Sequence, residues 1–224
     1  SLVPKNKIDG IKAQGAEVRI IGDNQDDAQE EVDRLVNEEN MTLIPPFDHH
    51  DIIAGQGTLG LEINEVLPEL NLAIVPLSGG GLISGVAKAL KSKNPKCKVI
   101  GVSMERGAAM YESQKAGRPI FVREEKTIAD ALGGGIGLDN KYTFRMVQDL
   151  VDDIILVSES EIISGVKHAY WEEKQIVEGS GAVAIAALLS KKIIPKETTV
   201  ALMCGSNIDL KSHHKIISGL SLTA

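Results

Sequence analysis

The sequence predicts an α/β protein with an open, mostly parallel sheet and helices on both faces. Short apolar runs alternate with helical patterns along the 224 residues, as in chains that build parallel sheets. Runs such as "LAIVPL" and "TVALMC" are apolar at nearly every position, which is typical of strands buried on both faces. A serine and three glycines stand directly between one such run and a helical pattern. These observations indicate a sheet whose strand ends carry functional loops.

Four elements are expected before residue 70. Residues 16–22 form an apolar run that predicts a strand, and residues 26–40 predict a helix with Ala28, Val32 and Leu35 on one face. Residues 41–47 predict a short strand closed by two prolines, and a helix capped by Asp48 follows. The prolines mark a candidate domain boundary near residue 46.

The rest of the chain continues the alternation. Strands are expected over 72–77, 98–104, 153–158 and 198–207, and helices over 82–93, 108–116, 140–151, 158–175 and 181–192. Ser158 and Glu161 form the pattern of a capping box. The last residues, with His213 and His214, are expected to form a polar, solvated tail.

Composition excludes several classes of protein. A hydrophobic fraction of 43% supports a large core, while 24 basic against 31 acidic residues disfavours nucleic acid as a partner. No apolar run approaches the roughly 20 residues that cross a bilayer, so no membrane partner is expected. Cys97 and Cys204 have neither disulfide nor zinc spacing, which favours a reducing cytoplasm.

The glycine segment "SGGG" after the run 72–77 has two interpretations. A glycine backbone can bring several N–H groups close to one anion, and the next helix adds the positive end of its dipole, so a phosphate site is favoured. The alternative is a tight strand–helix turn. No Gly-Lys-Ser/Thr follows, and "SGGGLISG" lacks the dinucleotide spacing. A single phosphate without a nucleotide fits better.

Seven segments in order carry a resemblance to a known family: "GAEVRIIG", "IPPFDHHDIIAGQGTLGLEI", "VPLSGGGLISGVA", "VIGVSMERGAAMYES", "IADALGGGIG", "VEGSGAVAIAAL" and "CGSNID". The chain resembles the pyridoxal-phosphate-dependent serine/threonine dehydratases, which share the fold of the tryptophan synthase β subunit and include serine racemase. "SMERGAAM" and "LGGGIGLDN" resemble the dehydratase of hydroxyectoine utilisation. The resemblance implies a fold type II enzyme, with residues 1–46 as the remainder of a small domain and 47–224 as the large cofactor-binding domain.

The resemblance also implies site residues. The cofactor phosphate would lie on the backbone of the loop: Ser78, Gly79, Gly80, Gly81 and Leu82. The family usually has glycine in place of Ser78, but serine keeps the N–H.

Cys204 stands where the family has a serine beside the pyridine nitrogen; without the resemblance it would be a buried core thiol. Glu178 matches an acid near the cofactor ring, or it is an acid favourable to a helix start. Asp130 and Ala131 match the substrate pocket, although Ala131 replaces a common glycine.

The metal-binding acids of many family members have no counterpart in this sequence. Ser103, Gly107 and Ala109 stand where many members place metal-binding acids, so no metal site is predicted; Glu105 would need a shifted geometry. His49 and His50 are expected to point apart at a helix start, a poor ligand pair.

The Ser-Phe-Lys-type motif with the Schiff-base lysine does not occur either. An N-terminal part of the family's domain is therefore expected to be missing, no catalytic residue is assigned within this chain, and the lysine is expected upstream of Ser1. Lys5, Lys7 and Lys12 are expected at the surface.

The implied activity is that of a lyase that converts a small β-hydroxy amino acid, such as threonine or serine, to a 2-keto acid and ammonia with pyridoxal 5'-phosphate. Alternatives are a dehydratase of hydroxylated diamino acid derivatives in hydroxyectoine utilisation and a serine racemase, for which Ser84 and Ser103 are candidate serines. A third, of another class, is a non-catalytic protein that binds a phosphate ligand. A homodimer is expected because enzymes of this type are often dimers.

Overall fold

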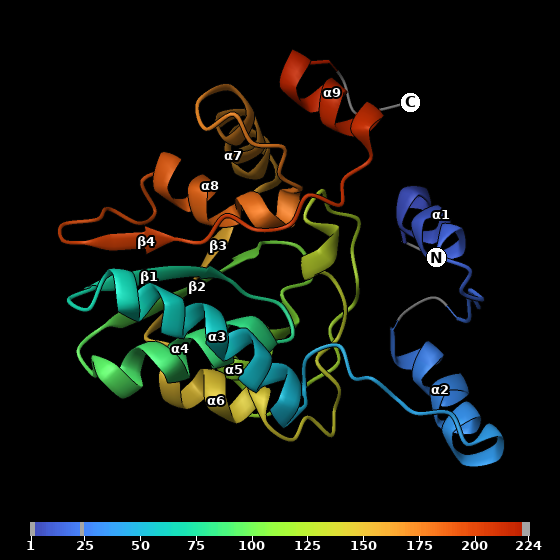
Figure 1. Ribbon diagram of the computed structural model, residues 1–224. Helices are drawn as coiled ribbons and strands as arrows, with labels where there is room; N and C mark the ends of the chain where they lie inside the picture. Colours follow the sequence, from blue (N-terminus) through green and yellow to red (C-terminus); the bar gives the residue numbers. More distant parts are fainter. Residues whose placement is uncertain (1–2, 23–24, 221–224) are drawn as a thin grey trace.

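The computed structural model describes residues 3–22 and 25–220 and contains one parallel sheet (Figure 1). Its strands are β1 (Leu72–Pro76), β2 (Lys98–Met104), β3 (Asp153–Val157) and β4 (Thr199–Ala201). They lie in the order β3-β2-β1-β4, and every neighbouring pair is parallel. The α/β class predicted from the sequence is therefore confirmed.

Helices precede, connect and follow the strands. They are α1 (Lys5–Ala13), α2 (Gln25–Glu39), α3 (His50–Val66), α4 (Gly81–Lys93), α5 (Ala109–Ala116), α6 (Thr143–Leu150), α7 (Glu159–Trp171), α8 (Val183–Leu189) and α9 (Leu210–Ser218). Two short 3-10 turns, η1 (Asp130–Leu132) and η2 (Gly179–Ala182), lie near the sheet. Within the described residues, no helix has both the length and the apolar character that a membrane crossing requires.

The sheet is buried on both faces, which explains the apolar strands. Ala73 and Val75 of β1 belong to a core shared with α3 and α4, whereas Ile74 belongs to a second core with Val183 of α8. Alternate residues of one strand thus pack against opposite layers. Figure 1 shows α3, α4 and α6 on one side of the sheet and α7 and α8 on the other. The carboxyl ends of the strands are left for loops.

Three strand predictions need correction. Residues 16–22 and 41–47 form no strand in the described structure, because neither has a neighbouring strand to bond with. The last strand covers only 199–201 rather than 198–207. After one further bond, from Leu202 N–H to the Ile74 carbonyl, the chain leaves the sheet, and the Gly205 carbonyl accepts from Glu178 N–H. This departure brings Cys204 and Gly205 to the candidate site.

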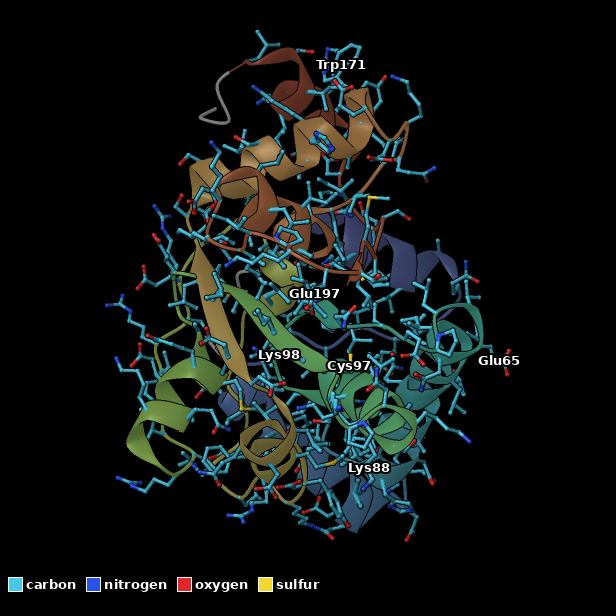
Figure 2. All side chains as sticks on the ribbon, turned by 90° about the vertical axis from the view of Figure 1, so that its left-hand side faces the viewer. Glu65, Lys88, Cys97, Lys98, Trp171 and Glu197 are labelled. Carbon is cyan, nitrogen blue, oxygen red and sulfur yellow. The ribbon has the colours of Figure 1, made fainter. Side chains whose placement is uncertain are left out.

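Helices α1 and α9 were not predicted. His213 is not solvated: it lies on α9 at 3% exposure, and its ring meets the edge of Tyr170 at 5.4 Å between centroids. His214 is exposed, as expected. Trp171 lies at the outer end of α7 beside α9 (Figure 2), and its Nε1–H donates to the Ile217 carbonyl at 3.3 Å. The polar tail is therefore a docked helix.

Asp48 does not cap the helix that follows it. His49 is the N-cap of α3, and its Nδ1 accepts from Asp51 N–H at 3.3 Å. The Asp48 carboxylate instead accepts three backbone N–H groups at the start of α6, from Lys141, Tyr142 and Thr143, at 2.6, 2.9 and 2.8 Å. This clasp joins the segment before α3 to a helix more than 90 residues away in the chain.

Candidate functional site

A cavity of about 340 Å³ lies at the carboxyl end of β1. This volume falls within the roughly 300–1,000 Å³ of small-molecule sites. Its lining includes the glycine loop, the start of α4 and parts of three further segments, which carry Ala131, Glu178 and Cys204. The sequence-predicted residues that line it are Ser78, Gly79, Gly80, Gly81, Leu82, Ala131, Glu178 and Cys204.

The glycine loop turns sharply into α4. Gly80 is the N-cap of α4 with φ of +92°, a left-handed conformation that favours glycine. The first N–H groups of a helix have no intrahelical acceptor, so the start of α4 presents donors and a positive dipole end to the cavity. This combination suits one anionic group, such as a phosphate.

Packing also requires glycine in this loop. A Cβ at Gly79 would lie 2.4 Å from the Phe47 ring, and one at Gly81 would lie 3.0 Å from the Phe47 Cβ. Phe47 itself lines the cavity. The glycines therefore serve a close approach between loop and ring as well as the turn, a reason that the sequence alone did not reveal.

Cys204 reaches the cavity because two glycines let its segment approach. A Cβ at Gly181 would lie 1.4 Å from the Cys204 carbonyl oxygen, and one at Gly205, where φ is +81°, would lie 2.4 Å from Glu178 Oε1. Burial raises the pKa of the Cys204 thiol, and the neighbouring Glu178 raises it further. The thiol therefore stays protonated and neutral near neutral pH.

Glu178 is buried at the cavity and shares a cation with Asp130. Lys7 Nζ lies 2.7 Å from Asp130 Oδ2 and 3.8 Å from Glu178 Oε2. Burial raises the pKa of Glu178, whereas Lys7 lowers it and Asp130 raises it. The prediction that Lys7 is a surface residue is wrong, since its side chain is only 19% exposed and faces two carboxylates. Its sequence context, a polar stretch before residue 16, carries no signal of this role.

The two residues predicted for the substrate pocket are adjacent but face different spaces. Ala131 lines the glycine-loop cavity, and its N–H donates to Ser180 Oγ at 2.9 Å. Asp130 lines a second cavity of about 470 Å³, which also touches α1, residues 18–22 and residues 124–127. Ser180 was not predicted from the sequence, although it belongs to the quoted segment "VEGSGA".

Other residues considered in the sequence have structural roles. Glu105 pairs with Lys192 at 3.3 Å. Ser84 and Ser103 are buried in the core, and neither is among the residues lining the cavity.

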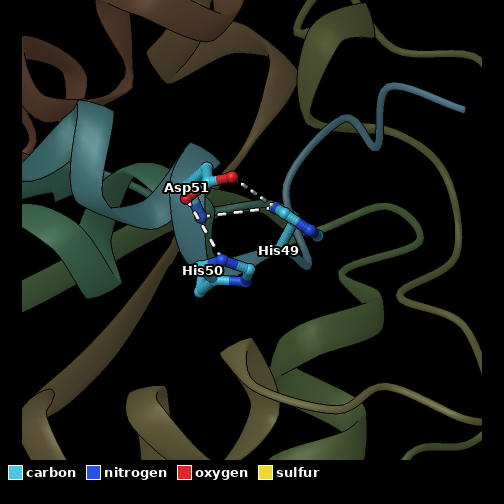
Figure 3. Close-up of side chains that lie close together, drawn as sticks. All are labelled: His49, His50 and Asp51. Atoms are coloured by element: carbon cyan, nitrogen blue, oxygen red, sulfur yellow. Dashed lines mark hydrogen bonds and ion pairs between the residues drawn. The ribbon is translucent and has the colours of Figure 1, made fainter. Parts of the chain in front are cut away.

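The two histidines at the start of α3 do not point apart, contrary to the expectation from the sequence. Their rings lie 4.2 Å apart between centroids, and His50 Nε2 lies 3.2 Å from Asp51 Oδ1 (Figure 3). His49 occupies the helix-start position that was predicted. The cluster is largely exposed, and the positive end of a helix dipole disfavours a cation there.

The donor set of the cavity fits pyridoxal phosphate. The loop and the α4 N-terminus offer donors for a phosphate, the neutral thiol of Cys204 suits an unprotonated ring nitrogen, and Phe47 offers an apolar wall.

Comparisons with known proteins agree with this fit. A family model described as pyridoxal-phosphate dependent enzyme matches residues 2–205. A putative threonine dehydratase of Sinorhizobium fredii is 53% identical over 220 residues, covering 98% of this chain and 66% of that protein.

Two solved structures are also similar. The processed form of threonine deaminase isoform 2 from Solanum lycopersicum has a TM-score of 0.84 at 37% identity, covering 98% of this chain and 61% of that one. Maize serine racemase has a TM-score of 0.84 at 33% identity, covering 96% and 67%.

The chain thus spans slightly less than two thirds of the curated relative's length. The family match extends over nearly the whole chain and includes the sheet, the glycine loop and the Cys204 segment. The chain belongs to the family of pyridoxal-phosphate-dependent enzymes.

Proposed function

We propose that the protein is a pyridoxal-phosphate-dependent lyase that removes water and then ammonia from a small β-hydroxy amino acid such as threonine or serine. The observation that carries this proposal is one cavity lined by the glycine loop, the α4 N-terminus and a neutral Cys204 thiol. The names of the relatives, threonine dehydratase and threonine deaminase, support the substrate class.

The loop residues would hold the cofactor through its phosphate. The backbone N–H groups of Ser78 to Leu82 and the dipole of α4 would bind the phosphate, and Phe47 would exclude water from one wall. Bound pyridoxal phosphate supplies an electron sink for the carbanion formed when the substrate loses its Cα proton.

Cys204 would set the electronic character of the site. Its thiol is kept neutral by burial and by Glu178, so it does not donate a full proton to a ring nitrogen. A weak partner suits β-elimination, in which the departing hydroxide takes the electron pair and a fully protonated ring is needed less. Ala131, fixed through Ser180, would line the substrate side of this cavity, whereas Asp130 faces the neighbouring cavity.

The test uses the complete gene product with pyridoxal phosphate. Borohydride reduction followed by peptide mass analysis should find one pyridoxyl-lysine, which we expect upstream of Ser1. Incubation with threonine or serine should release a 2-keto acid and ammonia. Bound cofactor with neither product would refute the lyase, and no modified lysine with retained phosphate-ligand binding would favour the non-catalytic binding protein.

Product analysis also distinguishes this lyase from a racemase and from a hydroxyectoine-utilisation dehydratase. A D-amino acid would indicate a racemase, for which the similarity to maize serine racemase is the supporting observation. A hydroxylated diamino acid derivative consumed faster than threonine would indicate the hydroxyectoine branch. We further propose that the protein forms a homodimer. Light scattering would measure the mass of the particle in solution. We also propose a cytoplasmic location, where both free cysteines stay reduced.

A further inference from the structure

Helix α1 contacts the segments around Asp130, Glu178 and Asn207 through polar side chains. None of its residues is buried. Asn6 Nδ2 donates to the Asn207 carbonyl and side-chain oxygens at 3.3 Å, and the neighbouring Lys7 reaches Asp130 and Glu178. Asn6 and Lys7, which are consecutive in α1, thus contact segments that are all more than 120 residues away in the chain.

Lys7 neutralises two buried carboxylates at once. Asp130 Oδ2 and Glu178 Oε2 are both buried atoms, and Lys7 is the partner that the structure gives to each. The side chains of Lys7, Asp130 and Glu178 are 19%, 22% and 11% exposed. Two carboxylates near one another without a cation repel and resist ionisation, so the lysine determines whether both can stay charged.

We propose that Lys7 is a positioning residue that fixes Glu178 at the cofactor cavity and Asp130 next to it, and couples the docking of α1 to the charge of that site. The inference rests on the proposed function, because that function names pyridoxal phosphate as the ligand of the cavity. The charged or titratable groups that face Glu178 are Lys7 from α1, Asp130 from η1 and Cys204 after β4. With Lys7 present, the cluster of Lys7, Asp130 and Glu178 carries one excess negative charge. Without it, two uncompensated carboxylates lie close to one another, and Glu178 lines the cavity that would hold an anionic cofactor.

The decisive variant is Lys7→Met, which removes the charge and keeps the aliphatic stem. Lys7→Arg keeps the charge, and Lys5→Met is the matched control, because Lys5 lies on the same helix, is 85% exposed and pairs with Asp9 one turn away. Each protein is melted at pH 5 and pH 8, and its affinity for pyridoxal phosphate is measured by fluorescence titration at pH 8.

We expect Lys7→Met to lose more thermal stability at pH 8 than at pH 5. Without Lys7, ionising both neighbouring carboxylates costs free energy at pH 8, whereas at lower pH Glu178, whose pKa is raised by burial, is protonated more readily in the folded state and the cost falls. Cofactor affinity should fall on the order of fivefold or more at pH 8. Lys7→Arg should restore both properties, and Lys5→Met should change neither.

Equal losses at both pH values, with unchanged cofactor affinity, would overturn the proposal, because loss of packing alone has no pH dependence. If Lys7→Met does not fold, the double variant Lys7→Met/Asp130→Asn decides, since removing one carboxylate should recover folding; failure to recover would also overturn it. Absence of cofactor binding by the unmodified protein would refute the proposed function, while the melting series would still decide the role of Lys7.

Discussion

The clasp made by Asp48 gives a prediction that can be worked from the structure. Its carboxylate accepts from Lys141 N–H through Oδ2 and from Tyr142 and Thr143 N–H through Oδ1. An Asp48→Ala variant leaves these three donors at the start of α6 to water. An Asp48→Asn variant keeps the Oδ1 acceptor and turns an amide donor toward Lys141 N–H.

The magnitude follows from the number of bonds lost. Replacing a capping side chain with alanine costs about 0.5–2 kcal/mol, and a hydrogen bond to a charged group contributes about 1.5–3 kcal/mol. Because Asp48 is partly exposed, water compensates in part, and we expect Asp48→Ala to lose about 2–3 kcal/mol of unfolding free energy. At about 2–4 °C per kcal/mol for a chain of this size, Tm falls by roughly 4–12 °C. Asp48→Asn should lose about 1 kcal/mol.

Urea unfolding followed by circular dichroism measures these values. The matched control is Asp149→Asn, because Asp149 lies on α6, the helix whose start Asp48 caps, and makes an exposed ion pair with Arg145 at 3.0 Å. Exposed pairs at this spacing contribute about 0.3–0.5 kcal/mol. A loss for Asp48→Ala no larger than that of the control, or equal losses for the Asn and Ala variants, would refute the reasoning.

Three further predictions concern the site and α9. Gly181→Ala should give no soluble folded protein, because its Cβ would overlap the Cys204 carbonyl oxygen; normal expression with an unchanged melt would contradict this. Iodoacetamide should alkylate Cys204 slowly at pH 7.5, since burial and Glu178 raise the pKa of its thiol. Pyridoxal phosphate should slow the alkylation of Cys204 further and leave the rate at Cys97 unchanged. The pKa of His213 is lowered by burial, so its contribution to stability is fully present above about pH 6.5 and is lost as the pH falls from there through the lower pKa of the folded state. His213→Gln should flatten the pH dependence of Tm between pH 5 and 8, and an unchanged slope would count against this account.

Much of the fold was readable because sheet burial leaves a plain pattern. Strand 98–104 was predicted with the bounds of β2, and the helix expected over 82–93 differs from α4 by one residue. The capping box at Ser158 and Glu161 is present at α7. These elements form one sheet or pack against its faces. Burial therefore decides which of their positions are apolar, and the resulting pattern can be read within each element.

The errors occurred where distant contacts decide the conformation. Residues 16–22 are apolar enough for a strand, yet a strand needs a neighbour that the described chain does not provide. His213 looked like part of a polar tail because its partner, Tyr170, lies more than 40 residues earlier in the chain. Lys7 looked like a surface lysine because both of its carboxylates come from segments beyond residue 120.

The site was only partly readable for a similar reason. The glycine loop, Glu178 and Cys204 were identified from residues that resemble a family, and the structure brings them to one cavity. Phe47 and Ser180 were missed, because their importance depends on what packs against them: the Phe47 ring lies where a Gly79 side chain would be, and Ser180 accepts from Ala131 N–H.

We propose above that the glycine-loop cavity binds pyridoxal phosphate through its phosphate. The most direct measurement is a fluorescence titration of the protein with pyridoxal phosphate and, separately, with pyridoxal, which lacks the phosphate. We expect saturable binding of pyridoxal phosphate and at least roughly tenfold weaker binding of pyridoxal, because the backbone donors and the α4 dipole act on the phosphate. Equal affinity for the two compounds, or no saturable binding of either, would contradict this proposal.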